Sequence, residues 1–157
     1  MKANLGIPEH DVEEIATLLN TLLADEYALY TKTRNAHWNV DGPNFHELHK
    51  FFENQYEVLD EMIDDIAERV RSLGHYALGS LKDFLSVTHM SEENKEFSNP
   101  KQIIQTLLSD HETIIRIIRN DVSPISDKYR DLGTADFVTG LMEKHEKMAW
   151  MLRSFLS

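Results

Sequence analysis

Helical periodicity of the apolar residues is the feature that most constrains the fold of this chain. Four long stretches carry apolar side chains at three- and four-residue spacing, and they cover residues 11–36, about 43–73, 99–122 and 135–157. This spacing places the apolar side chains along one face of an α-helix. No stretch of useful length alternates between apolar and polar residues, as a half-buried strand would. The sequence therefore predicts an all-α protein.

Local signals mark where these helices begin and end. Asp11, with Glu14 three residues later, has the pattern of a capping box at the start of the first helix. Gly74 is a C-terminal cap for the second helix, and Asn99-Pro100 begins the third. The remaining signals are the turn Asp41-Gly42-Pro43 before the second helix, Ser123-Pro124 at the end or at a kink of the third, and Asp131-Leu132-Gly133-Thr134 before the fourth.

Residues 75–98 form one long connection between the second and third helices, and we expect a short helix within it. The other connections are short, so helices one and two, and helices three and four, should pack antiparallel. The long connection allows helices two and three to run parallel. This arrangement is the four-helix bundle with a crossover found in ferritin-like folds. At 157 residues the chain is expected to be a single domain, 1–157, with a short N-terminal tail at residues 1–10.

Composition excludes several functional classes. The chain contains no cysteine, which excludes disulfides, thiolate metal sites and thiol catalysis. Its formal net charge of −11 favours the attraction of cations and argues against general attraction to a nucleic-acid backbone. No apolar run approaches the roughly 18 residues of a membrane span, and the N-terminal residues lack the pattern of a signal peptide. We therefore expect a cytoplasmic protein.

One stripe of the second helix carries potential metal ligands, namely His49, Glu53, Asp64 and Glu68. Measured from His49 at about 100° per residue, the three carboxylates lie at roughly 40°, 60° and 100° around the helix. The bulky apolar residues of this helix cluster on an arc beside that stripe and should face the bundle core. Imidazole and carboxylate groups suit first-row transition metals, so the stripe indicates a metal site on the flank of the bundle.

One helix cannot bring all of these side chains to a single ion. His49 and Asp64 lie roughly 22 Å apart along a helix, whereas metal–ligand bonds are about 2 Å long. An antiparallel copy of the same helix, related by a two-fold axis near residues 58–59, would place the histidine end of one chain opposite the Asp64 end of the other. His37, at the end of the first helix, would complete each site beside His49. The geometry predicts an intersubunit metal site.

A solvated acidic face explains the same spacing equally well. Acidic side chains one turn apart are common on exposed helix flanks, and a lone histidine such as His49 is more often structural than a ligand. Other metal chemistries are excluded more firmly. No Glu-x-x-His pair occurs, so the di-iron site inside the bundle of ferritins is not encoded. His46 and His49 are three residues apart and do not form the HExxH motif of zinc proteases.

Two spaced motifs carry a family resemblance. The first comprises His37-Trp38-Asn39-Val40, Gly42, Leu48-His49 and Glu53, and the second comprises Asp64, Ile66-Ala67-Glu68-Arg69, Leu73-Gly74 and Ala77. The C-terminal segment is similar as well, through Asp131, Thr134-Ala135-Asp136 and the residues from Trp150 to Leu156. In these motifs the chain resembles the Dps family of mini-ferritins (DNA-binding proteins from starved cells), and the resemblance covers essentially the whole sequence.

The resemblance implies a hollow dodecameric shell, built from two-fold dimers, with ferroxidase activity. His37, His49 and Glu53 of one subunit, with Asp64 and Glu68 of its partner, would be both the catalytic residues and the metal ligands. Each centre would hold two iron ions as the implied cofactor, oxidise Fe(II) with hydrogen peroxide in preference to oxygen, and pass the ferric product to a stored mineral. Such chemistry protects a cell and its DNA from oxidative damage.

The resemblance also assigns roles outside the five ligands. Asp131 and Asp136 match positions that line iron-admitting pores, although each side chain could instead cap a helix or be solvated, and Gly140 stands where some relatives carry a further acid. Trp38 is expected to pack over the centre, and an electron-donating role is the alternative. His46 is expected near the ligands or at the surface, and the other histidines are expected in structural or surface roles.

Direct compaction of DNA is the alternative function that the family name suggests. Relatives that bind DNA often use a mobile, lysine-rich terminal tail, whereas residues 1–10 here contain a single lysine, Lys2. An acidic shell without basic tails should bind DNA poorly at physiological salt. The sequence therefore favours iron oxidation and storage over direct DNA binding, and gives no indication of a membrane partner.

Overall fold

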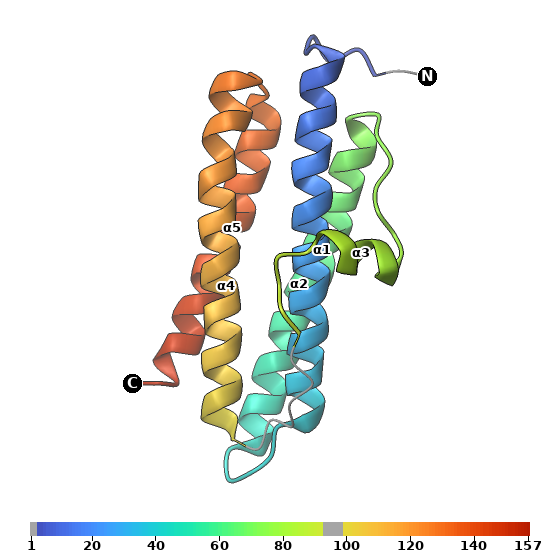
Figure 1. Cartoon of the computed structure of the whole chain (residues 1–157). Coiled ribbons are helices and arrows are strands. Elements are labelled where there is room, and N and C mark those ends of the chain that lie inside the picture. The colour runs from blue at the N-terminus through green and yellow to red at the C-terminus, as the bar shows by residue number, and fades with distance from the viewer. Residues whose placement is uncertain (1–2, 93–98) are drawn as a thin grey trace.

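The computed structural model describes residues 3–92 and 99–157, and within these ranges it contains helices and no strand. The helices are α1 (Glu9–Asn39), α2 (Phe45–Ser72), the short α3 (Leu81–Val87), α4 (Pro100–Ser123), a π-helical turn η1 (Pro124–Lys128) and α5 (Leu132–Ser154). The four long helices lie side by side as a bundle (Figure 1). The predicted all-α, ferritin-like fold is confirmed.

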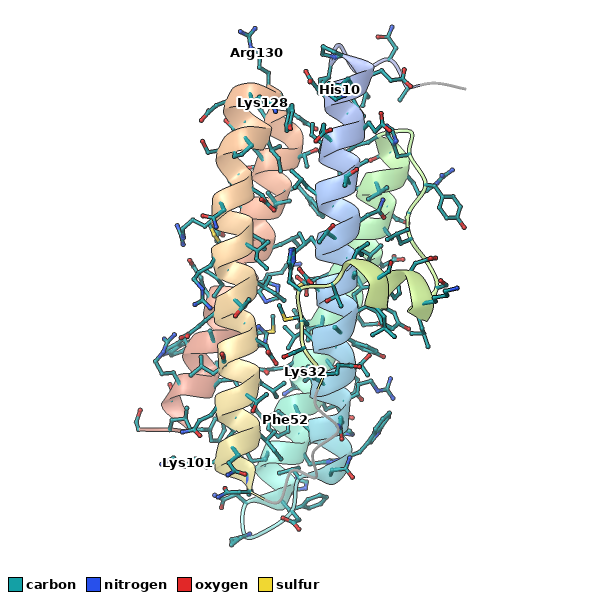
Figure 2. The ribbon with its side chains drawn as sticks, in the orientation of Figure 1. His10, Lys32, Phe52, Lys101, Lys128 and Arg130 are labelled. Atoms are coloured by element: carbon teal, nitrogen blue, oxygen red, sulfur yellow. The ribbon has the colours of Figure 1, made fainter. Side chains whose placement is uncertain are left out.

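The directions of the helices agree with the predicted topology. In Figure 1, α1 and α2 form one antiparallel pair, α4 and α5 form the other, and α2 and α4 run the same way. Figure 2 marks the course of α4, with Lys101 at one end of the bundle and Lys128 and Arg130, which follow the helix, at the other. The long connection carries α3 as expected, and its residues 93–98 lie outside the described residues.

Most of the predicted helix boundaries are observed. Gly74 follows α2 with φ +90°, and the amides of Gly74 and His75 bond to the carbonyls of Arg71 and Val70 at 2.9 and 3.2 Å. This pattern is a Schellman cap, which needs a residue with positive φ. The side chains of Asn99 and Asp131 accept hydrogen bonds from the backbone at the starts of α4 and α5, as the cap signals predicted.

The start of α1 differs from expectation, whereas the end of α4 agrees with it. Asp11 does not cap α1, because the helix begins two residues earlier and the carbonyl of Pro8 accepts the amides of Asp11 and Val12 at 3.0 and 3.1 Å. The signal at Ser123-Pro124 is confirmed, because α4 ends at Ser123. Proline lacks an N–H, and the backbone here widens into η1, where the amide of Tyr129 reaches the carbonyl of Pro124 at 3.1 Å.

The bundle core combines apolar packing with one buried polar cluster. Side chains from all four long helices are fully buried, among them Ile15, Phe52, Ile114 and Leu152. At the same time Glu26, His111 and His145 have no exposed surface. Over the described residues, no helix is both long enough and apolar enough to cross a membrane.

Candidate metal centre

The antiparallel packing of α1 on α2 brings His37 and His49 together. His37 lies in the last turn of α1, and His49 lies near the start of α2, after a short connection. Their imidazole rings stack with centroids 3.7 Å apart and planes inclined by 23°. His37 is only 8% exposed in the single chain. The two histidines of the first motif therefore form one preorganised pair.

Reciprocal hydrogen bonds fix both rings. Nδ1 of His37 lies 2.8 Å from the backbone oxygen of His49, and Nδ1 of His49 lies 2.8 Å from the backbone oxygen of His37. A carbonyl oxygen only accepts, so each Nδ1 must carry the proton and donate it. In a neutral ring the lone pair then resides on Nε2, which is the tautomer that a metal ligand needs.

Aromatic neighbours restrict the same two rings. Tyr56 meets His37 edge-on at 5.2 Å between ring centroids, and Phe45 lies 5.1 Å from His49. The Arg34 guanidinium lies 4.9 Å from the Tyr56 ring and 5.0 Å from the Trp38 ring. Trp38, expected over the centre, contacts Arg34 and remains 62% exposed in the single chain. Sequence reasoning missed the contact of Tyr56 with His37 and that of Arg34 with Tyr56, because both form only where α1 packs against α2.

Glu53 lies one turn beyond His49 and is held by a lysine. Lys50 Nζ contacts Glu53 Oε2, in a pair that the three-residue spacing on a helix could have indicated. The hydrogen bond from Lys50 lowers the pKa of Glu53, with the attraction of Lys50 and the two histidines adding to it and burial opposing it. Glu53 is therefore an ionised carboxylate at neutral pH, ready to bind a cation.

Asp64 and Glu68 lie further along α2 and are exposed. The apolar arc predicted for this helix does face the core, since Leu48, Phe52, Leu59, Ile66 and Val70 are buried. Among the residues that the structure describes, no three His, Asp or Glu side chains of the single chain gather around a common metal position. One chain thus presents a histidine pair with Glu53 at one end of α2 and two separate acids towards the other.

The predicted pore residues have different environments. Asp131 is buried at the start of α5, where it accepts a hydrogen bond of 2.9 Å from the Thr134 amide and lies 3.4 Å from Arg69 Nη2. In this chain it acts as a helix cap, which was one of the two roles considered for it. Asp136 is exposed, as is His46, which lies three residues before His49 in the chain.

The four-helix bundle with its crossover connection defines a ferritin-like protein. The family model described as "Ferritin-like domain" matches residues 16–157, and the chain belongs to that family. The DNA protection during starvation protein of Helicobacter pylori is 34% identical over 89% of this chain and 96% of its own length. Within the ferritin-like proteins, the chain is therefore a member of the Dps family.

Other relatives agree with this placement. A low temperature-induced protein of Nostoc sp., named as uncharacterized, is 45% identical over 99% of this chain and 87% of its own length. The Dps crystal structure from Vibrio cholerae superposes with a TM-score of 0.91 at 28% identity and covers 100% of this chain and 98% of its own. That protein is described as one of the ferritin-like diiron-carboxylate proteins. Dps from Thermosynechococcus elongatus matches with a TM-score of 0.87 at 32% identity, over 92% of this chain and 91% of its own.

Proposed function

We propose that this chain is a ferroxidase and iron-storage mini-ferritin. It binds two Fe(II) ions as substrate at each centre between two-fold related subunits and oxidises them, preferably with hydrogen peroxide. The ferric product is stored as mineral inside a dodecameric shell. In this proposal His37, His49 and Glu53 of one subunit act with Asp64 and Glu68 of its partner.

The histidine pair is the observation that carries the proposal. Two imidazoles whose Nδ1 protons are committed to backbone oxygens keep Nε2 as the nitrogen available to a metal, and the carboxylate of Glu53 lies one helical turn beyond His49. Nitrogen and carboxylate ligands with open positions suit Fe(II) that must meet an oxidant. Carboxylates also stabilise the extra positive charge of Fe(III). The donor set therefore fits iron.

The second half of each centre must come from another copy of the chain. Asp64 lies roughly 22 Å from His49 along α2, and both Asp64 and Glu68 are exposed. A two-fold axis near residues 58–59 would bring these acids to the partner's histidine pair and produce two identical centres per dimer.

Paired iron ions make the oxidation protective. Two Fe(II) ions react with a single hydrogen peroxide molecule, and each iron gives it one electron. The O–O bond breaks, and uptake of two protons gives two water molecules. No hydroxyl radical is released, because both electrons arrive at the same centre. Protection of DNA then follows from chemistry, and the net charge of −11 argues against direct DNA binding. A gel-shift titration that found tight DNA binding at moderate salt would contradict this part of the proposal.

Single variants test the centre. We expect His49→Ala and Asp64→Ala to slow Fe(II) oxidation by peroxide by at least about tenfold, the scale of losing one metal-orienting group, while the shell still assembles. Asp65→Asn is the matched control, because Asp65 is an exposed acid next to Asp64 and lies at roughly 160° from His49 around the helix, outside the stripe of proposed ligands. Wild-type rates in both ligand variants would refute the site.

Mixing the two slowed variants tests whether the centre is shared. In a dimer of one His49→Ala chain and one Asp64→Ala chain, one centre loses both ligands and the other keeps all of them. Random pairing makes half of the dimers mixed, so co-assembled shells should recover about a quarter of wild-type activity. A centre built within one chain would give no recovery.

A further inference from the structure

A cavity lies between α1 and α4, away from the histidine pair. It has a volume of about 320 Å³ and lies between Leu18 and Leu22 of α1 and Ile117 and Asp121 of α4. His89, which follows α3, forms part of its wall. In Figure 1 the chain leaving α3 crosses α1 towards α4 at this side of the bundle. The cavity therefore lies between the α1–α2 pair and the α4–α5 pair of helices.

A buried carboxylate fixes the His89 wall. Asp25 has no exposed surface, and it accepts hydrogen bonds from the His89 amide at 2.6 Å, from His89 Nδ1 at 2.9 Å and from Thr88 Oγ1 at 2.7 Å. These bonds satisfy Asp25 and attach the connection after α3 to α1. The cavity thus has a defined wall.

Asp121 lines the cavity, and its carboxylate has no hydrogen-bond or ion-pair partner among the described residues. It is half-buried, and none of the hydrogen bonds or ion pairs of the described residues involves its side chain. Burial raises the pKa of Asp121, Asp25 adds to the rise, and His89 opposes it. No lysine or arginine lines the cavity. The carboxylate of Asp121 therefore has no lysine or arginine side chain to pair with in this cavity.

The remaining walls select the kind of cation. Leu18, Leu22 and Ile117 provide an apolar surface, and Thr21 and Asn120 lie among the lining residues with oxygens that can accept hydrogen bonds. The Thr21 hydroxyl already donates to the Thr17 carbonyl, which leaves its oxygen as an acceptor. An ammonium group has three N–H donors and no acceptor. A divalent metal would find only His89 and Asp121, and no three-ligand group exists among the described residues.

We propose that this cavity binds a small primary alkylammonium ion. Its ammonium group pairs with Asp121, and its alkyl chain packs on Leu18, Leu22 and Ile117. The cavity holds the volume of about ten water molecules, which suits a chain of about six carbons. Because the bound ion contacts both α1 and α4, it stabilises the folded bundle by a free energy that rises with the logarithm of its concentration once this exceeds Kd. This site is independent of iron oxidation.

Calorimetric titration of the iron-free assembled protein with n-hexylammonium chloride tests the proposal. We expect saturable binding of one ion per chain in the millimolar range or tighter. Hexan-1-ol, which has the alkyl chain without the charge, and ammonium chloride, which has the charge without the chain, should each bind at least about tenfold more weakly. Asp121→Asn should weaken hexylammonium binding by at least about tenfold, because it removes the charge and keeps the shape.

Two further variants keep the test decisive. Glu143→Gln removes an exposed acid of α5 outside the cavity and should leave binding unchanged. Ile117→Thr shortens the apolar wall and should weaken binding severalfold even if Asp121→Asn fails to fold. Equal binding by wild type and Asp121→Asn would overturn the proposal, as would an absence of saturable binding or preferential binding of Zn²⁺ alone.

Discussion

Acid is expected to destabilise this bundle through His111. Its Nδ1 lies 2.9 Å from Nδ1 of His145, whose Nε2 lies 2.6 Å from Glu26 Oε1, and all three side chains are fully buried. Nε2 of His111 has no hydrogen-bond partner. Burial, followed by the electrostatic effect of His145, holds the pKa of His111 well below its ordinary value of 6.5.

The direction of the effect follows from proton binding. As the pH falls through about 6.5, the unfolded chain takes up a proton on His111 and the folded chain does not. A proton bound preferentially by the unfolded state lowers the free energy of unfolding. If the folded state takes up no proton on His111 over this range, the loss between pH 7 and pH 5 is about 2 kcal/mol.

Urea unfolding of iron-free protein measures this loss. Wild type and His111→Gln are compared at equal protein concentration near pH 7, pH 6 and pH 5. Glutamine keeps an N–H donor for His145 but cannot titrate. We expect the free energy of unfolding of wild type to fall by about 2 kcal/mol more than that of the variant over this range. His10→Gln, at an exposed position at the start of α1, should behave as wild type.

Parallel pH profiles for wild type and His111→Gln would refute the reasoning. They would mean that the buried imidazole is protonated equally in the folded and unfolded states. A steeper profile for the variant would refute it as well. Other titrating groups and subunit assembly contribute to both proteins alike, so the difference between the two profiles isolates His111.

Three further changes have defined expectations. Asp131→Ala removes the side-chain cap of α5 and should cost about 1–2 kcal/mol of unfolding free energy in urea; an unchanged midpoint would contradict the capping role. Gly74→Ala places a side chain at φ +90° with its Cβ 3.2 Å from Cβ of Ala3, so a loss of about 1–2 kcal/mol should appear in the same assay, and a more stable variant would exclude this strain. Lys50→Ala frees Glu53 and should raise Fe(II) affinity by less than about threefold, because exposed ion pairs are weak; anaerobic titration showing a loss of affinity would refute competition by Lys50.

Interactions between residues close together in the chain allowed much of the fold to be predicted from the sequence. Three- and four-residue spacing of apolar side chains fixes which face of a helix is buried, and the buried Phe52 and Ile66 of α2 agree with it. The caps at Gly74 and Asn99 depend on backbone groups within a few residues, so sequence neighbours suffice to predict them. The predicted cap at Asp11 was wrong because the helix starts earlier, and the carbonyl of Pro8 already accepts the amides of Asp11 and Val12.

The candidate centre shows where sequence reasoning ends. Spacing along α2 places His49 and Glu53 on one stripe and shows that Asp64 lies too far along the helix to share their ion. It does not show that His37 and His49 stack and exchange hydrogen bonds through their backbone oxygens. That arrangement depends on how closely α1 packs against α2, which is a property of the packed side chains.

The sequence by itself therefore determined the helices, their order and the ligand stripe, because each rests on contacts within a few turns. Only the tertiary structure decided which polar groups meet across helices. Glu26 and His145 are 119 residues apart in the chain, and no periodic pattern connects them. Asp121 likewise lacks a partner only because of where α4 lies beside α1. Such contacts depend on the distance between helices, which the sequence pattern of a single helix does not encode.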